Sequence, residues 1–327
     1  MGGELQILVN NIDPPYTASY PLDGTRLFEG KPVARGYRVE PLADVEGYLE
    51  VDPGVLEKEK PDYGDLLGCF LGAGVMGYLN RREFEKKRRM LENLKAGVVY
   101  IPDTNVLYHR FLSNHGRIPM DEIALVETVY NEIDASLKSV YTPREVRLMK
   151  GEAKFHGYLV DGLLERRMKN SRKAAYLALQ EYRGLSDEVI KVPAVGETGP
   201  DKEENALVFL KSIVEYGRDW GSYPVVLTTD HIMAEACEEA DLDHFLFRVP
   251  RRLSGRDVTA GRFLGLIRLV SCVYGFMRLN GALIIGEYGG KRERDELKAF
   301  LGGQRAERFR RDLVTSRRLM SRIKEKK

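Results

Sequence analysis

The chain has 327 residues, of which 43% are hydrophobic and 31% are charged, and its formal net charge at pH 7 is +2. This length allows one large domain or two modest domains with a substantial core. No apolar run reaches transmembrane length, and the first residues lack the basic-then-apolar layout of a signal peptide, so we expect neither a membrane protein nor a secreted one.

The three cysteines, Cys69, Cys237 and Cys272, lie far apart in the sequence and each has an apolar, helical context. This placement predicts reduced core residues, and neither a disulfide framework nor a zinc site. We therefore expect a cytoplasmic protein. The high charge content, with glutamine at three positions only, is typical of a thermophile surface rich in ion pairs.

The charge is unevenly distributed along the chain. Residues 1–65 carry 13 acidic and 6 basic side chains, whereas residues 288–327 carry 14 basic and 6 acidic ones. This asymmetry favours a polyanionic partner for the basic parts. A solvated helix face is an equally good interpretation of any single basic run.

Residues 1–96 are predicted to form a small β-rich segment followed by connecting helices. Apolar patterns broken by turn residues predict short strands at residues 4–12, 34–42 and 47–53. From about Pro61 the apolar spacing becomes helical, and a strongly charged helix is expected to end at Gly97.

Residues 97–250 alternate between short apolar runs and helical patterns, which predicts a mainly parallel sheet. The predicted strands lie at residues 98–102, near residue 124, at 224–230 and at 244–250. A helical insertion is predicted at about 144–196. Its basic residues are Lys150, Lys154, Arg166, Arg167, Lys169, Arg172 and Lys173, and its aromatic residues include Phe155, Tyr158, Tyr176 and Tyr182.

Basic side chains beside aromatic ones are suited to phosphate contact and base stacking, so the insertion is a candidate nucleic-acid interface. An ordinary amphipathic helical pair with inward tyrosines is an equally good interpretation. Residues 251–327 are predicted to form a helix–strand–helix extension. The extension opens with a basic turn at Arg251 and Arg252, which we add to the candidate interface. Its basic terminal helix could cap the fold, form a homo-oligomer or bind a phosphate backbone.

Four acidic positions lie at matching places in the predicted sheet. Asp103 ends the first strand, Glu132 is in the helix after the second, and Asp230 ends the run PVVLTTD. The fourth position is the first turn of a helix, which contains Asp201, Glu203 and Glu204. Strand ends and helix starts meet at one edge of a parallel sheet. Clustered carboxylates repel one another, and Mg²⁺ or Mn²⁺ is the usual neutralising ion. Such a metal activates water and clamps a phosphodiester, so the pattern predicts metal-dependent hydrolysis of nucleic acid.

Each acid also has a structural interpretation. Asp201 and Glu204 could form a capping box, and Asp230 could cap the helix that starts at His231. Other chemistries are less well supported. The histidines lack zinc-ligand spacing, and no nucleophile-elbow or phosphate-loop motif is present. The glycines of residues 72–77 follow a helical pattern, which indicates that they allow helices to pack closely.

Three motifs in order resemble the PIN-domain family. They are VVYIPDTNVLYHRFL at 98–112, VETVYNEIDASL at 126–137 and VVLTTDHIMAEA at 225–236. The resemblance implies a three-layer α/β/α sandwich with a central, mainly parallel sheet, to which the small β-rich N-terminal part and the helical insertion would be added. It also implies divalent-metal-dependent nuclease activity, most often on RNA.

On this resemblance Asp103, Glu132 and Asp230 are metal ligands, with Asn105 and Thr228 as supporting polar residues. The family has an aspartate in the first turn of the helix before the last motif. By its offset from the apolar run that begins at Ala206, Glu204 matches this position better than Asp201 does. Glutamate there departs from the family pattern, which puts metal affinity or activity in doubt.

The sequence thus predicts a divalent-metal-dependent endonuclease that hydrolyses single-stranded RNA with Mg²⁺ or Mn²⁺. Two alternatives remain open. One is a PIN-fold nucleic-acid-binding or scaffold protein with weak or no catalytic activity. The glutamate at a position where the family has an aspartate favours this alternative. The other is a PIN-like nuclease that acts on DNA.

Overall fold

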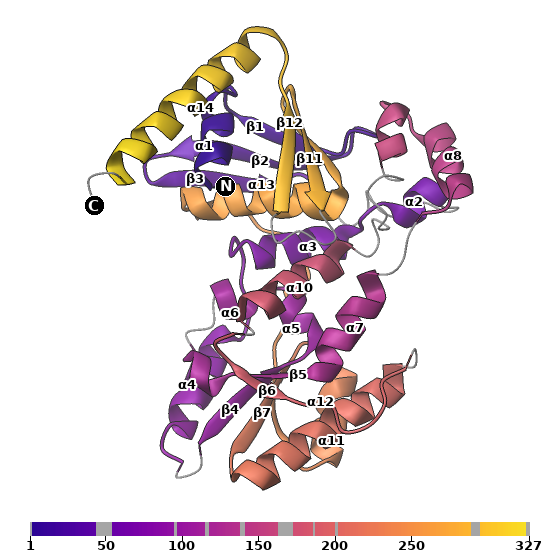
Figure 1. Ribbon diagram of the computed structural model, residues 1–327, viewed down its shortest axis with the longest axis vertical. Helices are drawn as coiled ribbons and strands as arrows, with labels where there is room; N and C mark the ends of the chain where they lie inside the picture. Colours follow the sequence, from indigo (N-terminus) through magenta and orange to yellow (C-terminus); the bar gives the residue numbers. More distant parts are fainter. Residues whose placement is uncertain are drawn as a thin grey trace. The chain divides into compact units, whose positions relative to one another are not determined.

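The computed structural model describes residues 2–43, 54–94, 97–114, 118–137, 141–162, 173–185, 187–199, 202–288 and 295–324 (Figure 1). The chain divides into two compact units, each made of separated segments. Unit 1 comprises Met1–Cys69, Val140–Ser171 and Leu253–Lys327, and unit 2 comprises Phe70–Ser139 and Arg172–Arg252. The units therefore cut across the three consecutive parts that the sequence suggested.

Unit 1 is built on a seven-stranded antiparallel sheet with strand order β12-β11-β10-β1-β2-β3-β9. Its strands are β1 (Tyr16–Ser19), β2 (Arg26–Val33), β3 (Gly36–Pro41), β9 (Arg256–Val258), β10 (Phe276–Leu279), β11 (Ala282–Tyr288) and β12 (Asp295–Phe300). Its helices are α1 (Gly2–Asn10), α2 (Val55–Glu59), α3 (Tyr63–Gly72, whose last residues belong to unit 2), α8 (Pro143–Glu152), η3 (Gly157–Val160), α13 (Ala260–Tyr274) and α14 (Gly303–Lys324).

This sheet shows that the predicted fold class is wrong. The largest sheet of the chain is antiparallel, so the protein is not a three-layer sandwich around a central parallel sheet. The physical reason is a long-range pairing: β1 hydrogen-bonds β10, with Ala18 opposite Leu279. Periodicity identifies a strand but does not identify a partner that lies more than 250 residues away.

The β10–β11 hairpin turns through two residues, Asn280 and Gly281, and the Asn280 backbone is left-handed with φ of 50°. The Asn280 carboxamide donates to the carbonyl oxygens of Asp13 and Pro15 and accepts from the backbone N–H of Thr17. An Asn-Gly pair between apolar runs is a strong hairpin signal. It ties the C-terminal strands to the N-terminal ones.

Helix α13 packs against β3, β10 and β11 and is buried along most of its length. It begins with Thr259 as N-cap, whose hydroxyl accepts from the Arg262 N–H. At Gly286 the backbones of β11 and α13 approach so closely that an added Cβ would lie 2.6 Å from the Ser271 carbonyl oxygen. The sequence predicts a buried strand here, and the structure confirms it.

Unit 2 contains two small parallel sheets. The first has strand order β4-β7-β8 and the second pairs β5 with β6, and a parallel bridge between Tyr100 and Ile123 links them. The strands are β4 (Val98–Pro102), β5 (Ala124–Val126), β6 (Ile190–Val192), β7 (Tyr223–Thr228) and β8 (Asp243–Leu246). The helices are α4 (Arg81–Leu91), α5 (Thr104–Tyr108), α6 (Phe111–Asn114), η2 (Met120–Glu122), α7 (Glu127–Leu137), α10 (Lys173–Leu185), α11 (Lys202–Trp220) and α12 (His231–Glu239).

The predicted strands near residues 98, 124, 224 and 244 are therefore present and pair in parallel. Two local predictions are wrong: residues 4–12 are largely helical rather than extended, and strand β6 lies within the region predicted as a helical insertion. The predicted strand at 47–53 lies outside the described residues. The short apolar run near Leu8 satisfies helix and strand patterns equally, and its burial against the rest of unit 1 decides between them.

The three cysteines are all buried and form no disulfide with one another, so their predicted place in the core is confirmed. Within the described ranges, no helix combines the length and apolarity needed to cross a bilayer.

The close approach at Gly286 gives a stability prediction. We expect Gly286→Ala to lower the free energy of unfolding by about 1–3 kcal/mol, because the new methyl group meets α13 backbone that cannot move away. Chemical denaturation followed by circular dichroism measures the change. Gly3→Ala is the matched control, since no atom lies within 4 Å of the added Cβ there. Equal stability of the two variants would contradict the packing argument.

Candidate active site

Asp103 lies at the carboxyl end of β4 and caps α5. Its Oδ1 accepts from the Val106 N–H at 2.8 Å, and its own N–H donates to the Leu227 carbonyl at 2.9 Å. Pro102 ends the strand, and the Asp103 backbone is extended, as an N-cap requires. The first turn of α5 therefore holds the carboxylate, and β7 holds the backbone of the same residue.

Thr228 joins Asp103 to Asp230. Because β4 and β7 are parallel, with Pro102 opposite Leu227, the residues that follow them lie side by side. The Thr228 hydroxyl donates to Asp103 Oδ2 at 2.6 Å and accepts from the Asp230 N–H at 2.9 Å. Asp230 is exposed and caps α12 by accepting from the Ile232 N–H.

Glu132 reaches the same place from α7. Its Oε2 accepts from the Thr104 hydroxyl at 2.6 Å, and Thr104 is the residue after Asp103. The adjacent threonine thus orients a second carboxylate toward the end of β4. Sequence reasoning did not single out Thr104, although its place in the Asp-Thr-Asn motif was a signal.

These side chains line one cleft with a volume of about 650 Å³. Its lining includes the carboxylates of Asp103, Glu132, Glu203 and Asp230 together with Asn105, and no lysine or arginine from the described part of the chain. Thr128 also lines the cleft, and its buried hydroxyl has no hydrogen-bond partner among the described residues. The cleft is therefore acidic, with a polar group left for a ligand.

The pKa of Asp103 is raised to about 6, chiefly by burial and to a smaller extent by the nearby Asp230 carboxylate. Hydrogen bonds from Thr228, Val106 and Asn105 act in the opposite direction because they favour the ionised form. Desolvation is the larger effect. A bound proton or a nearby cation would offset the free-energy cost of burying this ionised carboxylate.

The third acid is placed differently from the sequence-based expectation. Both glutamates are exposed, but Glu203 lines the cleft and Glu204 does not. Both belong to the first turn of α11. Asp201 lies outside the described residues. On a helix, neighbouring residues point about 100° apart, so an offset of one residue decides which glutamate faces the cleft.

The donor set fits a hard divalent cation, because carboxylate oxygens are the ligands that Mg²⁺ and Mn²⁺ prefer. Asp103, Glu132, Glu203 and Asp230 would hold the ion. In the described parts of the chain, no three acidic, histidine or cysteine side chains are already drawn together as a metal cluster. The fit therefore rests on the chemistry of the lining and on the desolvated Asp103.

The predicted basic interface is described only in part. Lys150 pairs with Asp161 at 2.6 Å, and Lys154, Arg251 and Arg252 are exposed. Arg166, Arg167, Lys169 and Arg172 lie outside the described residues, as does the side chain of Lys173. None of the basic side chains that are described lines the acidic cleft.

Comparisons with known proteins add little to this geometry. No protein-family model matches the chain, and no curated protein matches it. A similar solved structure is described as a domain of a functionally unknown protein from Methanocaldococcus jannaschii DSM 2661. It is 14% identical, the match covers 49% of this chain and 99% of that one, and the TM-score is 0.30.

The raised pKa of Asp103 predicts that the folded state is less stable when this carboxylate is ionised. An unfolded aspartate loses its proton near pH 4, whereas Asp103 in the fold keeps it to about pH 6, so the folded state binds more protons in this window. Stability therefore falls as the pH rises from about 4 to 6. We expect Asp103→Asn, measured in EDTA, to gain roughly 1–3 kcal/mol over the wild type at pH 7.5, with the gain disappearing at pH 4.

The control is Asp219→Asn, which removes an exposed carboxylate from α11. It should leave the pH dependence unchanged. A gain for Asp103→Asn that is the same at both pH values would show that burial of the charge is not its cause.

Proposed function

We propose that the chain is a PIN-like, divalent-metal-dependent endonuclease that hydrolyses single-stranded RNA. The observation that carries this proposal is the acidic cleft, which is lined by Asp103, Glu132, Glu203 and Asp230 from four separate elements. An acidic cleft without basic side chains repels a polyanion unless a cation is bound there. A metal-dependent reaction on a phosphodiester accounts for this combination.

Each residue of the cleft has a role in this proposal. Asp103 is the central ligand, held rigid by Thr228 and by the cap of α5, while Thr104 keeps Glu132 in position. When bound, Mg²⁺ or Mn²⁺ supplies charge neutralisation and lowers the pKa of water at the phosphodiester. The buried Thr128 hydroxyl is placed to donate to a phosphate oxygen or to water.

Two exposed apolar side chains of the cleft support the proposal that the substrate is single-stranded. Leu207 and Ile232 both line the cleft and are 58% and 76% exposed. Exposed apolar side chains beside a site are typical of ligand contact, and unstacked bases offer apolar faces that a duplex hides. The preference for RNA over DNA comes from the resemblance to the PIN-domain family. The three reduced cysteines agree with the proposed cytoplasmic location.

The proposal predicts cleavage of a fluorescently labelled single-stranded RNA with Mn²⁺ or Mg²⁺ and none in EDTA. We expect Asp103→Asn to lower the cleavage rate at least 100-fold, because the variant keeps the fold but loses the central charged ligand. Asp219→Asn is the matched control and should cleave like the wild type. Wild-type rates for Asp103→Asn would disprove the site.

The same assay distinguishes the alternatives. RNA that is bound but not cleaved would identify a nucleic-acid-binding protein. Preferential cleavage of single-stranded or flap DNA in competition with RNA would identify a DNA-directed nuclease.

The two neighbouring glutamates give a second, sharper test of the geometry. We expect Glu203→Gln to slow cleavage at least tenfold and Glu204→Gln to have less than a threefold effect, because only Glu203 lines the cleft. The two substitutions remove the same charge from the same helix turn, so each controls for the other. The reverse order of effects would assign the third ligand to Glu204.

A further inference from the structure

Unit 1 contains a cleft of its own, with a volume of about 370 Å³. Strands β10 and β11, the end of β12 and the segment around η3 form its walls. The side chains that matter for its chemistry are His156, Tyr158, Arg278, Leu283, Ile285 and Phe300. Among the described lining residues, this cleft has an arginine and no carboxylate, whereas the cleft of unit 2 has four carboxylates and no basic side chain.

The floor of this cleft is one face of the antiparallel sheet. Arg278, Leu283 and Phe300 lie opposite one another on β10, β11 and β12, so they form a row across three strands. Gly286 faces α13, and residues at odd numbers on the same strand therefore face the other side. The row thus lies on the sheet face that turns away from α13.

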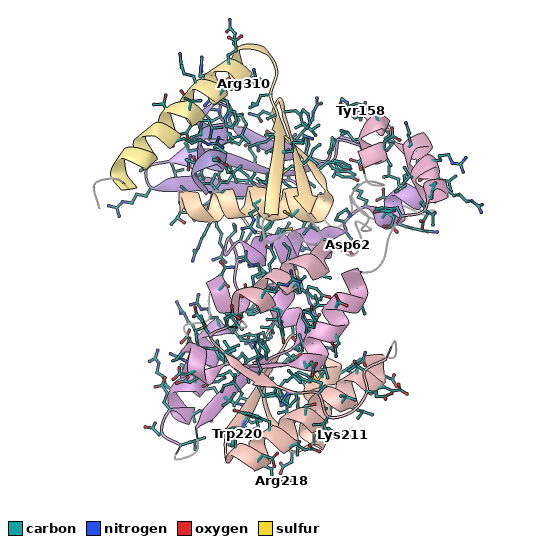
Figure 2. All side chains as sticks on the ribbon, viewed as in Figure 1. Asp62, Tyr158, Lys211, Arg218, Trp220 and Arg310 are labelled. Atoms are coloured by element: carbon teal, nitrogen blue, oxygen red, sulfur yellow. The ribbon has the colours of Figure 1, made fainter. Side chains whose placement is uncertain are left out.

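The wall of the cleft carries an exposed tyrosine. Tyr158 lies on η3 and is 62% exposed (Figure 2). His156 adopts a left-handed backbone with φ of 51°, and its ring stands edge-on to Tyr158 at 5.9 Å. The Phe155 N–H donates to the Leu22 carbonyl, which ties this segment to the loop before β2. Tyr158 is therefore presented by an anchored turn.

Arg278 supplies a positive charge that no described residue neutralises. Its side chain is partly buried, lines the cleft and forms no ion pair or side-chain hydrogen bond with the part of the chain that the structure describes. Lys298 adds a second charge, with its Nζ 5.7 Å from the centre of the Phe300 ring. A partly desolvated guanidinium gains free energy when a phosphate pairs with it in bidentate geometry.

We infer that this cleft binds one nucleotide of a single-stranded RNA. The base stacks on Tyr158 and Phe300, which are both exposed, and the phosphate pairs with Arg278. A cleft of about 370 Å³ admits a single nucleotide and excludes a duplex. Helix α14 follows the cleft residue Gly302 directly and is rich in arginine, so it attracts the flanking phosphates. The inference rests on the proposed RNA substrate but does not depend on cleavage.

Fluorescence anisotropy of a labelled 12-nucleotide uridine oligomer, titrated with the full chain in EDTA, tests this inference. We expect Tyr158→Ala and Phe300→Ala each to raise Kd about tenfold through lost stacking, and Tyr158→Phe to retain binding. Arg278→Gln should raise Kd and reduce the slope of log K against log salt by about 0.7, the value for one phosphate contact on a single strand.

The matched controls remove the same kinds of group elsewhere. Trp220→Ala deletes an exposed aromatic side chain on α11 (Figure 2). Arg35→Gln deletes an exposed charge in the β2–β3 turn. Both should bind like the wild type. Thermal unfolding of every variant checks that the fold is retained, and only variants within a few degrees of the wild type are compared.

The outcomes separate this inference from the proposed nuclease activity. A wild-type Kd for all three cleft variants, or equal losses in the two controls, overturns the nucleotide cleft even if the chain cleaves RNA. Selective loss of binding in the cleft variants supports it even if no cleavage is detected with Mn²⁺. Absence of wild-type binding to the oligomer overturns it as well.

Discussion

The acidic cleft depends on one buried carboxylate, that of Asp103, held at the end of a parallel strand by neutral donors. The Val106 N–H and the Thr228 hydroxyl occupy its two oxygens without neutralising its charge. Desolvation and the nearby Asp230 carboxylate make the ionised form of Asp103 unfavourable, which raises its pKa. A cation bound beside Asp103 offsets this cost, and the free energy recovered adds to its affinity. The same buried charge therefore lowers the stability of the site and strengthens cation binding.

The two units differ in the electrostatics of their clefts. In unit 2 the described cleft lining holds four carboxylates and no basic side chain, whereas the cleft in unit 1 holds Arg278 beside exposed aromatic rings. A strongly acidic site repels the nucleic acid on which we propose that it acts. Affinity for the strand must then come from basic and aromatic surfaces elsewhere on the chain, which is the role we propose for unit 1.

Local patterns predicted β4, β5, β7 and β8 of unit 2, because each is a short apolar run next to turn or helix signals, but they missed β6. They did not reveal the strand pairing of the larger sheet. There β1 pairs with β10 across most of the chain, and the Asn280 carboxamide bonds to the backbone near Pro15 and Thr17. The Asn280-Gly281 pair is a hairpin signal that the sequence contains. The sequence does not show that β1 pairs with this hairpin, because strands form the same hydrogen bonds whatever number of residues separates them.

The sequence by itself determined that β4 and β7 are buried strands of a parallel sheet, and thus that Asp103, Thr228 and Asp230 lie at one sheet edge, since parallel strands end together. Only the tertiary structure decided that Glu203 rather than Glu204 lines the cleft, that Thr104 orients Glu132, and that Arg278 and Phe300 share a face with an exposed tyrosine beside them. These features depend on helix rotation and on strand pairing, and both are set by packing between segments far apart in the chain.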